Sequence, residues 1–179
     1  FYYNQNRTYV LFRGDYMNYS HLEDFIKEFY FKMNSITPPL LDFREIAKNL
    51  GIKVFYWSET SQALYANDLP YIFLDESLTP QQQWQEFCHE LAHVLLHTGD
   101  QFYMYPLFRE YQEYKANNFM YHACMPTFML DELQLYDYLP QTVVKLQELF
   151  NVEYEFAMKR LTQYLNKRFY VPHWNSRKC

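Results

Sequence analysis

Residues 89 to 93 read H-E-L-A-H, which places two histidines and a glutamate together near the middle of the chain. Side chains four residues apart lie one turn apart on the same face of an α-helix, so His89 and His93 could bind one metal ion. Glu90 lies about 100° further round the helix, where a carboxylate can take a proton from water and pass it to a leaving group. The pattern predicts metal-assisted hydrolysis with Glu90 as the general base.

A third metal ligand is required, because a catalytic zinc ion usually has three protein ligands and one open position. Glu113 is the preferred candidate, since it lies 20 residues after His93 on the next predicted helix. Packing of that helix against the histidine helix would bring the carboxylate to the metal. Asn117, one turn further on, could accept a hydrogen bond from a ligand imidazole and orient it. Two imidazoles and one carboxylate favour zinc, with manganese as the alternative.

Three other side chains are open as alternatives for the third ligand. His97 follows His93 by one turn, but three ligands in line on one helix surround an ion poorly. Glu110, one turn before Glu113, takes the role if the helical register differs, and Asp100 is the weakest candidate. The longer metzincin pattern is excluded, because the residues at positions 96 and 99 do not match it.

A hydrolytic site of this kind also needs a side chain that stabilises the oxyanion. The candidates for this role are Tyr111, Tyr121 and His122. The same His122, and also His21 and His173, have the more ordinary interpretation of packing or surface residues.

The chain has three cysteines, at positions 88, 124 and 179, without the spacing of a disulfide framework. They predict free thiols in a reducing compartment, with Cys88 in the core.

The elements that must position these residues are helices and one small sheet. A capping box at residues 79–82 begins the helix that carries the motif, and Gly99 is its predicted end. The next long helix is predicted at 106–125. Shorter elements are predicted from capping patterns, periodicity and β-branched or aromatic runs. They are helices at 20–33, 42–50, 128–135, 141–150 and 153–168, and strands at 52–57, 64–65 and 71–74.

This order of elements predicts an α+β, mainly helical, zincin-like domain with a small sheet and a central motif helix. A chain of 179 residues with no internal repeat or linker fits a single metallopeptidase domain over residues 1–179. Only three residues are glycine, which argues against glycine-rich phosphate loops. Met17 could be an original start, so residues 1–16 are interpreted as an upstream extension.

Charge and hydropathy exclude other classes of function. The formal net charge is -5, whereas a nucleic-acid-binding protein usually has a basic face, so no direct nucleic-acid binding is expected. The helices at 141–150 and 153–168 could mimic a helix-turn-helix, but Glu153 and Glu155 stand where base-contacting residues usually lie. No apolar run reaches the ~18 residues that span a bilayer, and no leader is recognised. These features predict a cytoplasmic protein without membrane contact, and they specify no oligomeric state.

Two central segments resemble the ImmA/IrrE metallopeptidases. Residues 87–97 look like that family's H-E-x-x-H signature, and residues 113–126 look like the helix that follows it. The resemblance extends to a helix-then-strand element at 42–54 and a helical hairpin at 143–161, so it covers about residues 40–165. The sequence departs from the family pattern at Ala92, where glycine is usual, and at residues 120–124, which are bulkier.

The resemblance implies a compact gluzincin-type peptidase with His89, His93 and Glu113 as ligands and Glu90 as base. Members of that family are typically encoded by phages, integrative elements and stress regulons, and commonly cleave or act against helix-turn-helix repressors. The resemblance therefore implies a zinc endopeptidase that cleaves a transcriptional repressor and relieves repression. The alternative is an anti-repressor that sequesters the repressor without cutting it and has a vestigial metal site. Retention of Glu90 argues against this alternative.

Overall fold

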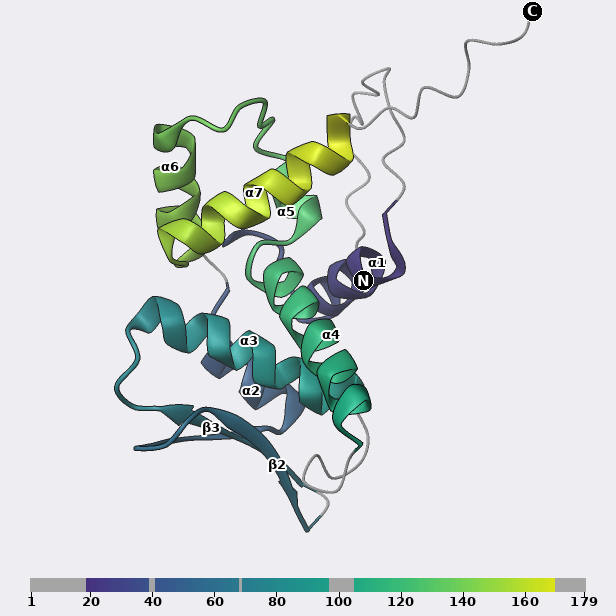
Figure 1. Ribbon diagram of the computed structural model, residues 1–179, viewed down its shortest axis with the longest axis vertical. Helices are drawn as coiled ribbons and strands as arrows, with labels where there is room; N and C mark the ends of the chain where they lie inside the picture. The colour runs from purple at the N-terminus through teal and green to yellow at the C-terminus, as the bar shows by residue number, and fades with distance from the viewer. Residues whose placement is uncertain (1–18, 39–40, 68, 97–104, 170–179) are drawn as a thin grey trace, which may run out of the picture.

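The computed structural model describes residues 19–38, 41–67, 69–96 and 105–169, and it is a mainly helical α+β protein with one small sheet (Figure 1). This confirms the predicted fold class. The elements follow in the order α1 (His21–Lys32), α2 (Phe43–Leu50), β1 (Lys53–Trp57), β2 (Gln62–Ala66), β3 (Leu69–Asp75), α3 (Pro80–Leu96), α4 (Pro106–Cys124), α5 (Thr127–Asp131), α6 (Pro140–Phe150) and α7 (Tyr154–Phe169).

The helix that carries the motif begins where the sequence predicts it. Before α3, the Thr79 hydroxyl accepts from the Gln82 backbone at 3.3 Å, and the Gln82 side chain accepts from the Thr79 backbone at 3.0 Å. These reciprocal bonds satisfy backbone donors that the first helical turn leaves unpaired. Gly51 ends α2 with φ of 69°, a conformation that glycine adopts without steric cost.

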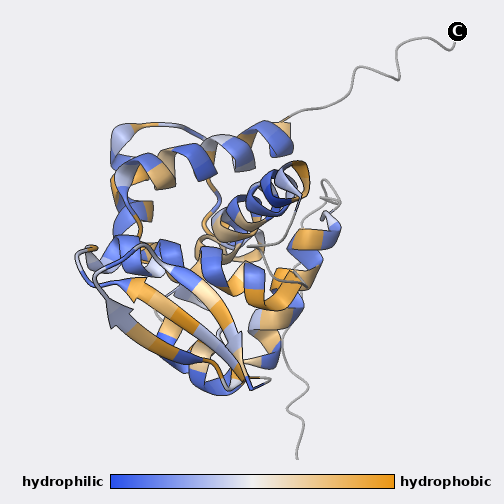
Figure 2. Ribbon diagram, turned by 60° about the horizontal axis from the view of Figure 1, so that its bottom comes forward, coloured by the Kyte–Doolittle hydropathy of each residue, from blue (hydrophilic) through white to orange (hydrophobic). Residues whose placement is uncertain are grey.

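The sheet has the strand order β1-β3-β2, with β1 parallel and β2 antiparallel to the central strand β3. Helices α2 and α3 lie against one face of the sheet, where Ile72 and Leu74 are fully buried (Figure 1). Apolar segments run along the strands in Figure 2. Strand β2 lies at the edge of the sheet. It also contacts α3, the helix that carries the motif.

The core is centred on α3, and α4 crosses it (Figure 1). Phe87, Leu91 and Ala92 have no exposed surface, so one face of α3 is packed fully into the core. Cys88 and Cys124 are buried free thiols, also as predicted. This packing holds α3 and α4 in a fixed relation, which the metal site requires.

Some predictions are corrected or fall outside the described residues. The helix predicted at 128–135 is the shorter α5, which ends at Asp131. The predicted end of α3 at Gly99, the candidates His97 and Asp100, and the assignments for residues 1–16, His173 and Cys179 lie outside the described residues. In the part of the chain that the structure describes, no helix combines the length and apolar character needed to cross a membrane.

Candidate metal centre

Helix α3 presents His89 and His93 on one face, one turn apart. Their ring centroids are 5.0 Å apart, and the two Nε2 atoms approach to 3.2 Å. The side chain of His93 is 6% exposed and that of His89 is 14% exposed. The neighbouring residues of this helix face the core, so the backbone that carries the imidazoles cannot shift easily.

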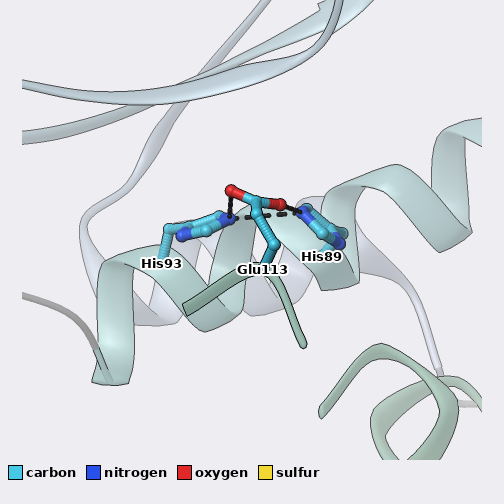
Figure 3. A group of neighbouring side chains, drawn as sticks. All are labelled: His89, His93 and Glu113. Carbon is cyan, nitrogen blue, oxygen red and sulfur yellow. Dashed lines mark hydrogen bonds and ion pairs between the residues drawn. The ribbon is translucent and has the colours of Figure 1, made fainter. Parts of the chain in front are cut away.

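Helix α4 brings Glu113 to the two imidazoles (Figure 3). One carboxylate oxygen, Oε2, lies 3.1 Å from Nε2 of His89, and the other, Oε1, lies 3.5 Å from Nε2 of His93. Ligand atoms from these three residues all lie within 4.8 Å of one another. The structure therefore brings together the three residues that the sequence singled out as metal ligands.

The chemistry of this donor set fits a zinc ion. Two imidazole nitrogens and one carboxylate oxygen are the ligands of many catalytic zinc sites, which keep a fourth position for substrate. Glu113 is 42% exposed, so solvent reaches one side of the group. Among the described contacts, the only ion-pair partners of the Glu113 carboxylate are the two histidines. A bound cation would relieve the electrostatic conflict of converging acceptor atoms.

Glu90 lies beside the three candidate ligands but belongs to a different environment. Its side chain is buried, and its carboxylate accepts a hydrogen bond from the backbone N–H of Ala63 in β2. Burial raises the pKa of Glu90 to about 8, against the effect of that hydrogen bond, with smaller contributions from Glu86 and Glu113. A carboxyl group with such a pKa can both accept and release a proton near neutral pH.

Two features around the centre were not found by sequence reasoning. Strand β2 contacts α3 closely, since the Tyr65 hydroxyl donates to the Val94 carbonyl at 2.8 Å. Glu86 lies one turn before Glu90, and burial raises the pKa of its carboxyl. The spacing of four residues could have indicated Glu86, because it places both carboxyls on one side of the helix. The position of β2 depends on packing and has no local signal.

The predicted orienting residue and the alternative third ligand are placed elsewhere. Asn117 is exposed, and its Nδ2 donates to the backbone carbonyl of Glu113 at 2.9 Å, within its own helix. It does not accept from a ligand imidazole here. Glu110 is exposed on α4 and is not part of the group of candidate ligands. Glu113 is the carboxylate that lies with His89 and His93, in agreement with the helical register predicted from the sequence.

The two tyrosine candidates for the oxyanion role point toward other partners. Tyr111 is 53% exposed, stacks with Phe108 and lies under the Lys115 ammonium group. Tyr121 stacks on Phe156 of α7 with ring centroids 4.4 Å apart. Neither described set of contacts includes a candidate metal ligand, so the oxyanion role of these tyrosines stays a prediction that the geometry does not favour.

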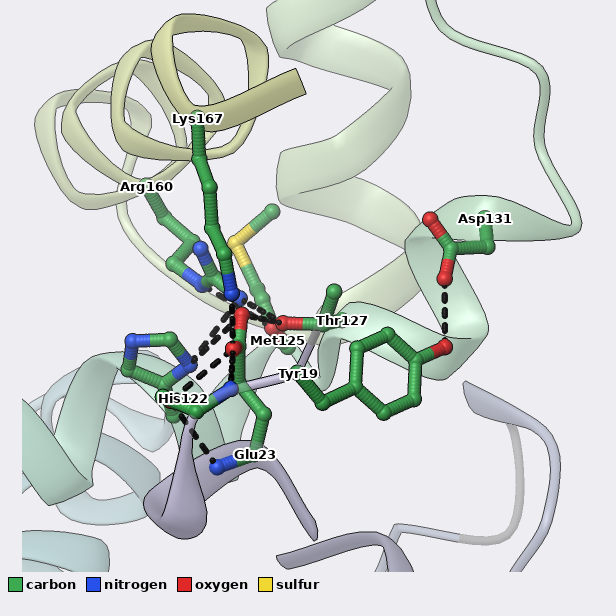
Figure 4. A network of polar contacts seen from close by, with 9 residues as sticks. Tyr19, Glu23, His122, Met125, Thr127, Asp131, Arg160 and Lys167 are labelled. Atoms are coloured by element: carbon green, nitrogen blue, oxygen red, sulfur yellow. Dashed lines mark hydrogen bonds and ion pairs between the residues drawn. The ribbon is translucent and has the colours of Figure 1, made fainter. Parts of the chain in front are cut away.

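His122 lies in a second polar group, which we call the buried ion cluster, formed by Glu23, His122, Thr127, Arg160 and Lys167 (Figure 4). An Arg160 Nη2 donates to Nδ1 of His122 at 3.2 Å. Burial and the Arg160 charge lower the pKa of His122 to about 3, so the ring is neutral. Nine positions separate it from Glu113, roughly 13 Å along the helix axis. Its position thus disfavours the predicted oxyanion role.

The model of the IrrE N-terminal-like domain, Peptidase M78, matches residues 47–162, which include both helices of the centre. These residues lie within the segment of about residues 40–165 in which the sequence motifs resemble the ImmA/IrrE metallopeptidases.

Two relatives come from Bacillus subtilis (strain 168). The phage-like element PBSX protein XkdA is 39% identical over 155 residues, which are 87% of this chain and 77% of that protein. The uncharacterized protein YqaB is 35% identical over 148 residues, which are 83% of this chain and 86% of that protein.

Proposed function

Because this chain belongs to the IrrE N-terminal-like family, Peptidase M78, we propose that it is a zinc-dependent endopeptidase. The observation that carries the proposal is the convergence of His89, His93 and Glu113 within 4.8 Å beside a buried glutamate. In this proposal the three residues hold the metal. A zinc ion held there supplies Lewis acidity, which polarises a scissile carbonyl and makes water more acidic.

Glu90 is the proton carrier in the proposed reaction. Its carboxylate is held in place by the Ala63 backbone, and its pKa lies near neutrality because the group is buried. It takes a proton from the attacking water and delivers it to the nitrogen of the leaving amine. A cation among the neighbouring ligands would lower the pKa of Glu90 and favour its basic form.

The edge strand β2 supports a peptide as substrate. It borders the sheet on the side where α3 carries the site, and it contacts that helix through Tyr65. An extended peptide can add to an exposed strand edge through backbone hydrogen bonds, without a specific side chain at each position. A substrate bound along β2 would pass close to Glu90, because Ala63 of this strand contacts Glu90.

We further propose that the protein substrate is a helix-turn-helix transcriptional repressor in the cytoplasm. Support comes from the family resemblance and from the relative described as a protein of a phage-like element. The second candidate function is sequestration of such a repressor without cleavage. The buried, hydrogen-bonded Glu90 favours cleavage, because binding alone has no use for a proton carrier.

The test is incubation of the zinc-loaded protein with the repressor encoded beside its gene, read by intact mass. Defined fragments are expected with the wild type and none with Glu90→Gln, which keeps the size of the side chain. Glu148→Gln, which changes an exposed glutamate on α6, is the matched control and is expected to cleave normally. Undiminished cleavage by Glu90→Gln would contradict the role of Glu90. An intact repressor in a stable complex with both proteins would favour sequestration.

A further inference from the structure

The outward face of helix α4 carries several large, exposed hydrophobic side chains. Its inner face is formed by buried residues, including Gln112, Ala116 and Phe119. The opposite side presents Leu107, Tyr111 and Tyr114, which are 70%, 53% and 69% exposed. Large apolar side chains that adjoin one another on a surface helix are typical of an interaction surface.

The spacing of this face is that of a coiled coil. Leu107, Tyr111, Tyr114 and Asn118 succeed one another at intervals of four, three and four residues, which is the alternation of the d and a positions in a heptad. We call these four residues the outer seam. In this register Ala116 takes the f position, which faces away from a partner helix, and it is fully buried against the protein's own core. One helix therefore packs inward through one face and presents a heptad face outward, in which Leu107, Tyr111 and Tyr114 are exposed and Asn118 is half-buried.

The charges beside the outer seam identify the partner. Glu110 takes the g position and Lys115 takes the e position that follows five residues later. In a parallel pair of helices, g of one chain lies next to the following e of the other, so identical helices would form two Glu110–Lys115 ion pairs. Asn118 occupies an a position, where a single asparagine favours two parallel strands in register. The seam is complementary to itself.

We propose that the outer seam of α4 pairs with the same seam of a second copy of this chain, as a short parallel two-helix coiled coil. Lys115 now lies over the Tyr111 ring at 5.3 Å and would turn toward Glu110 of the other copy. Beyond Asn118 the helices diverge, because Tyr121 stacks on Phe156 of its own chain. A seam of under two heptads gives a weak dimer whose population rises with protein concentration.

The proposed dimer leaves the candidate metal centre accessible. Glu113 takes the c position, on the flank between the buried face and the seam, so the pairing does not cover it. Glu110 borders the seam on the same flank, one turn from Glu113. The second copy would therefore border the approach to the centre. Pairing itself needs neither zinc nor cleavage, so its test is independent of the proposed function.

The test measures the mass of the full chain in solution across a concentration series by sedimentation equilibrium. The wild type is expected to rise from the 22.1 kDa of one chain toward twice that mass. Glu110→Lys and Lys115→Glu each replace two attractive contacts with two repulsive ones, and each is expected to weaken self-association about tenfold. An equimolar mixture of these two variants restores opposite charges in both pairs, so a mixed dimer of wild-type strength is expected.

Further variants separate the seam from other surfaces. Tyr114→Lys, within the seam, is expected to abolish the dimer, whereas Tyr136→Lys changes a similarly exposed tyrosine elsewhere and is expected to keep it. Circular dichroism checks that each variant keeps its helices. A wild type that stays monomeric at all concentrations would overturn the proposal. Two other results would also overturn it: self-association of Glu110→Lys and Lys115→Glu as strong as in the wild type, or a mixture of these two variants that fails to associate.

Discussion

Helix α4 contributes to two groups of histidine and carboxylate side chains that are completed in different ways. Near its middle, Glu113 meets His89 and His93, and the described ion pairs of this group involve only these three residues. At its C-terminal end, His122 belongs to the buried ion cluster, where Lys167 and Arg160 supply positive charge. Similar ligand chemistry thus occurs twice, once with a lysine and an arginine among the described partners and once, as far as the described ion pairs show, with histidines alone.

The difference identifies the group that is available for a metal. Glu23 of the buried ion cluster accepts hydrogen bonds from Lys167, from Thr127 and from Ser20, so its lone pairs are used. Such a group is structural, because a further cation would have to displace the partners that the buried Glu23 carboxylate already has. At the candidate metal centre the ligand atoms converge on one another, and Glu113 remains 42% exposed. That arrangement favours a cation from solution.

The largest effect is expected from breaking the buried ion cluster at Glu23. The Glu23→Ala variant removes the ion-pair partner of Lys167 and the capping box of α1, and it also removes a negative charge that favours the charged form of the buried Arg160. We expect the free energy of unfolding to fall by about 3–5 kcal/mol, measured by urea denaturation at pH 7. The control is Glu28→Ala on the same helix, where the exposed pair with Lys32 should contribute under about 1 kcal/mol. Equal losses in both variants would remove the distinction between the two groups.

Acid should weaken the same cluster in two steps. Burial opposes ionisation of Glu23, but hydrogen bonds from Lys167, Ser20 and Thr127 lower its pKa from 4.5 to about 2. Below pH 4.5 the unfolded state therefore binds a proton that the folded state does not, and stability falls as the pH falls. His122, with its pKa lowered from 6.5 to about 3, acts in the same direction from about pH 6.5 downward.

The measurement is the free energy of unfolding by urea from pH 7 to pH 4. We expect Glu23→Gln to lose stability more gently below pH 4.5 than the wild type, and His122→Gln to lose it more gently between pH 6.5 and 4.5. A wild type whose stability is constant over the whole range would show that neither group has a shifted pKa. The matching prediction for Glu113 concerns metal affinity, because this carboxylate is partly exposed.

Removing Glu113 should have the opposite profile to removing Glu23. In Glu113→Ala the zinc affinity is expected to fall at least about 100-fold, equivalent to about 2.7 kcal/mol, because one of three ligands is lost. Without zinc its free energy of unfolding should change by under about 0.5 kcal/mol, since the side chain is 42% exposed. Competition with a chromogenic zinc chelator measures the affinity. Glu110→Ala is the control. A larger loss of zinc affinity in Glu110→Ala than in Glu113→Ala would mean that Glu110, and not Glu113, is the third ligand.

The sequence could predict that His89, His93 and Glu113 lie together because helical periodicity is rigid. The spacing of His89 and His93 fixes their direction once α3 forms, and the same periodicity defines the face of α4 that carries Glu113. The capping residues of α3 are local signals, and the structure bears them out. The prediction of Glu113 also relied on the two helices packing together, which their apolar faces favour.

The buried ion cluster could not be predicted in this way. Glu23 and Lys167 are 144 residues apart in the sequence, and their contact depends on how α1 and α7 pack. His122 is one of the oxyanion candidates that the sequence offers, but in the structure it contacts Arg160 of α7 and lies near Glu23 of α1. The contact between Glu90 and Ala63 has the same origin, because β2 reaches α3 only through the packing of the sheet.

The smallest effect is expected from Asn117, and it tests whether α4 contributes to the centre beyond Glu113. Because its Nδ2 donates to the Glu113 carbonyl and the side chain is exposed, Asn117→Ala should change zinc affinity by less than about threefold. Loss of a residue that orients a ligand typically lowers affinity by about 10–100-fold. The chelator competition used for Glu113→Ala separates these ranges. A tenfold loss would mean that Asn117 turns toward an imidazole when zinc binds, and that the centre, unlike the buried ion cluster, is completed only with its metal.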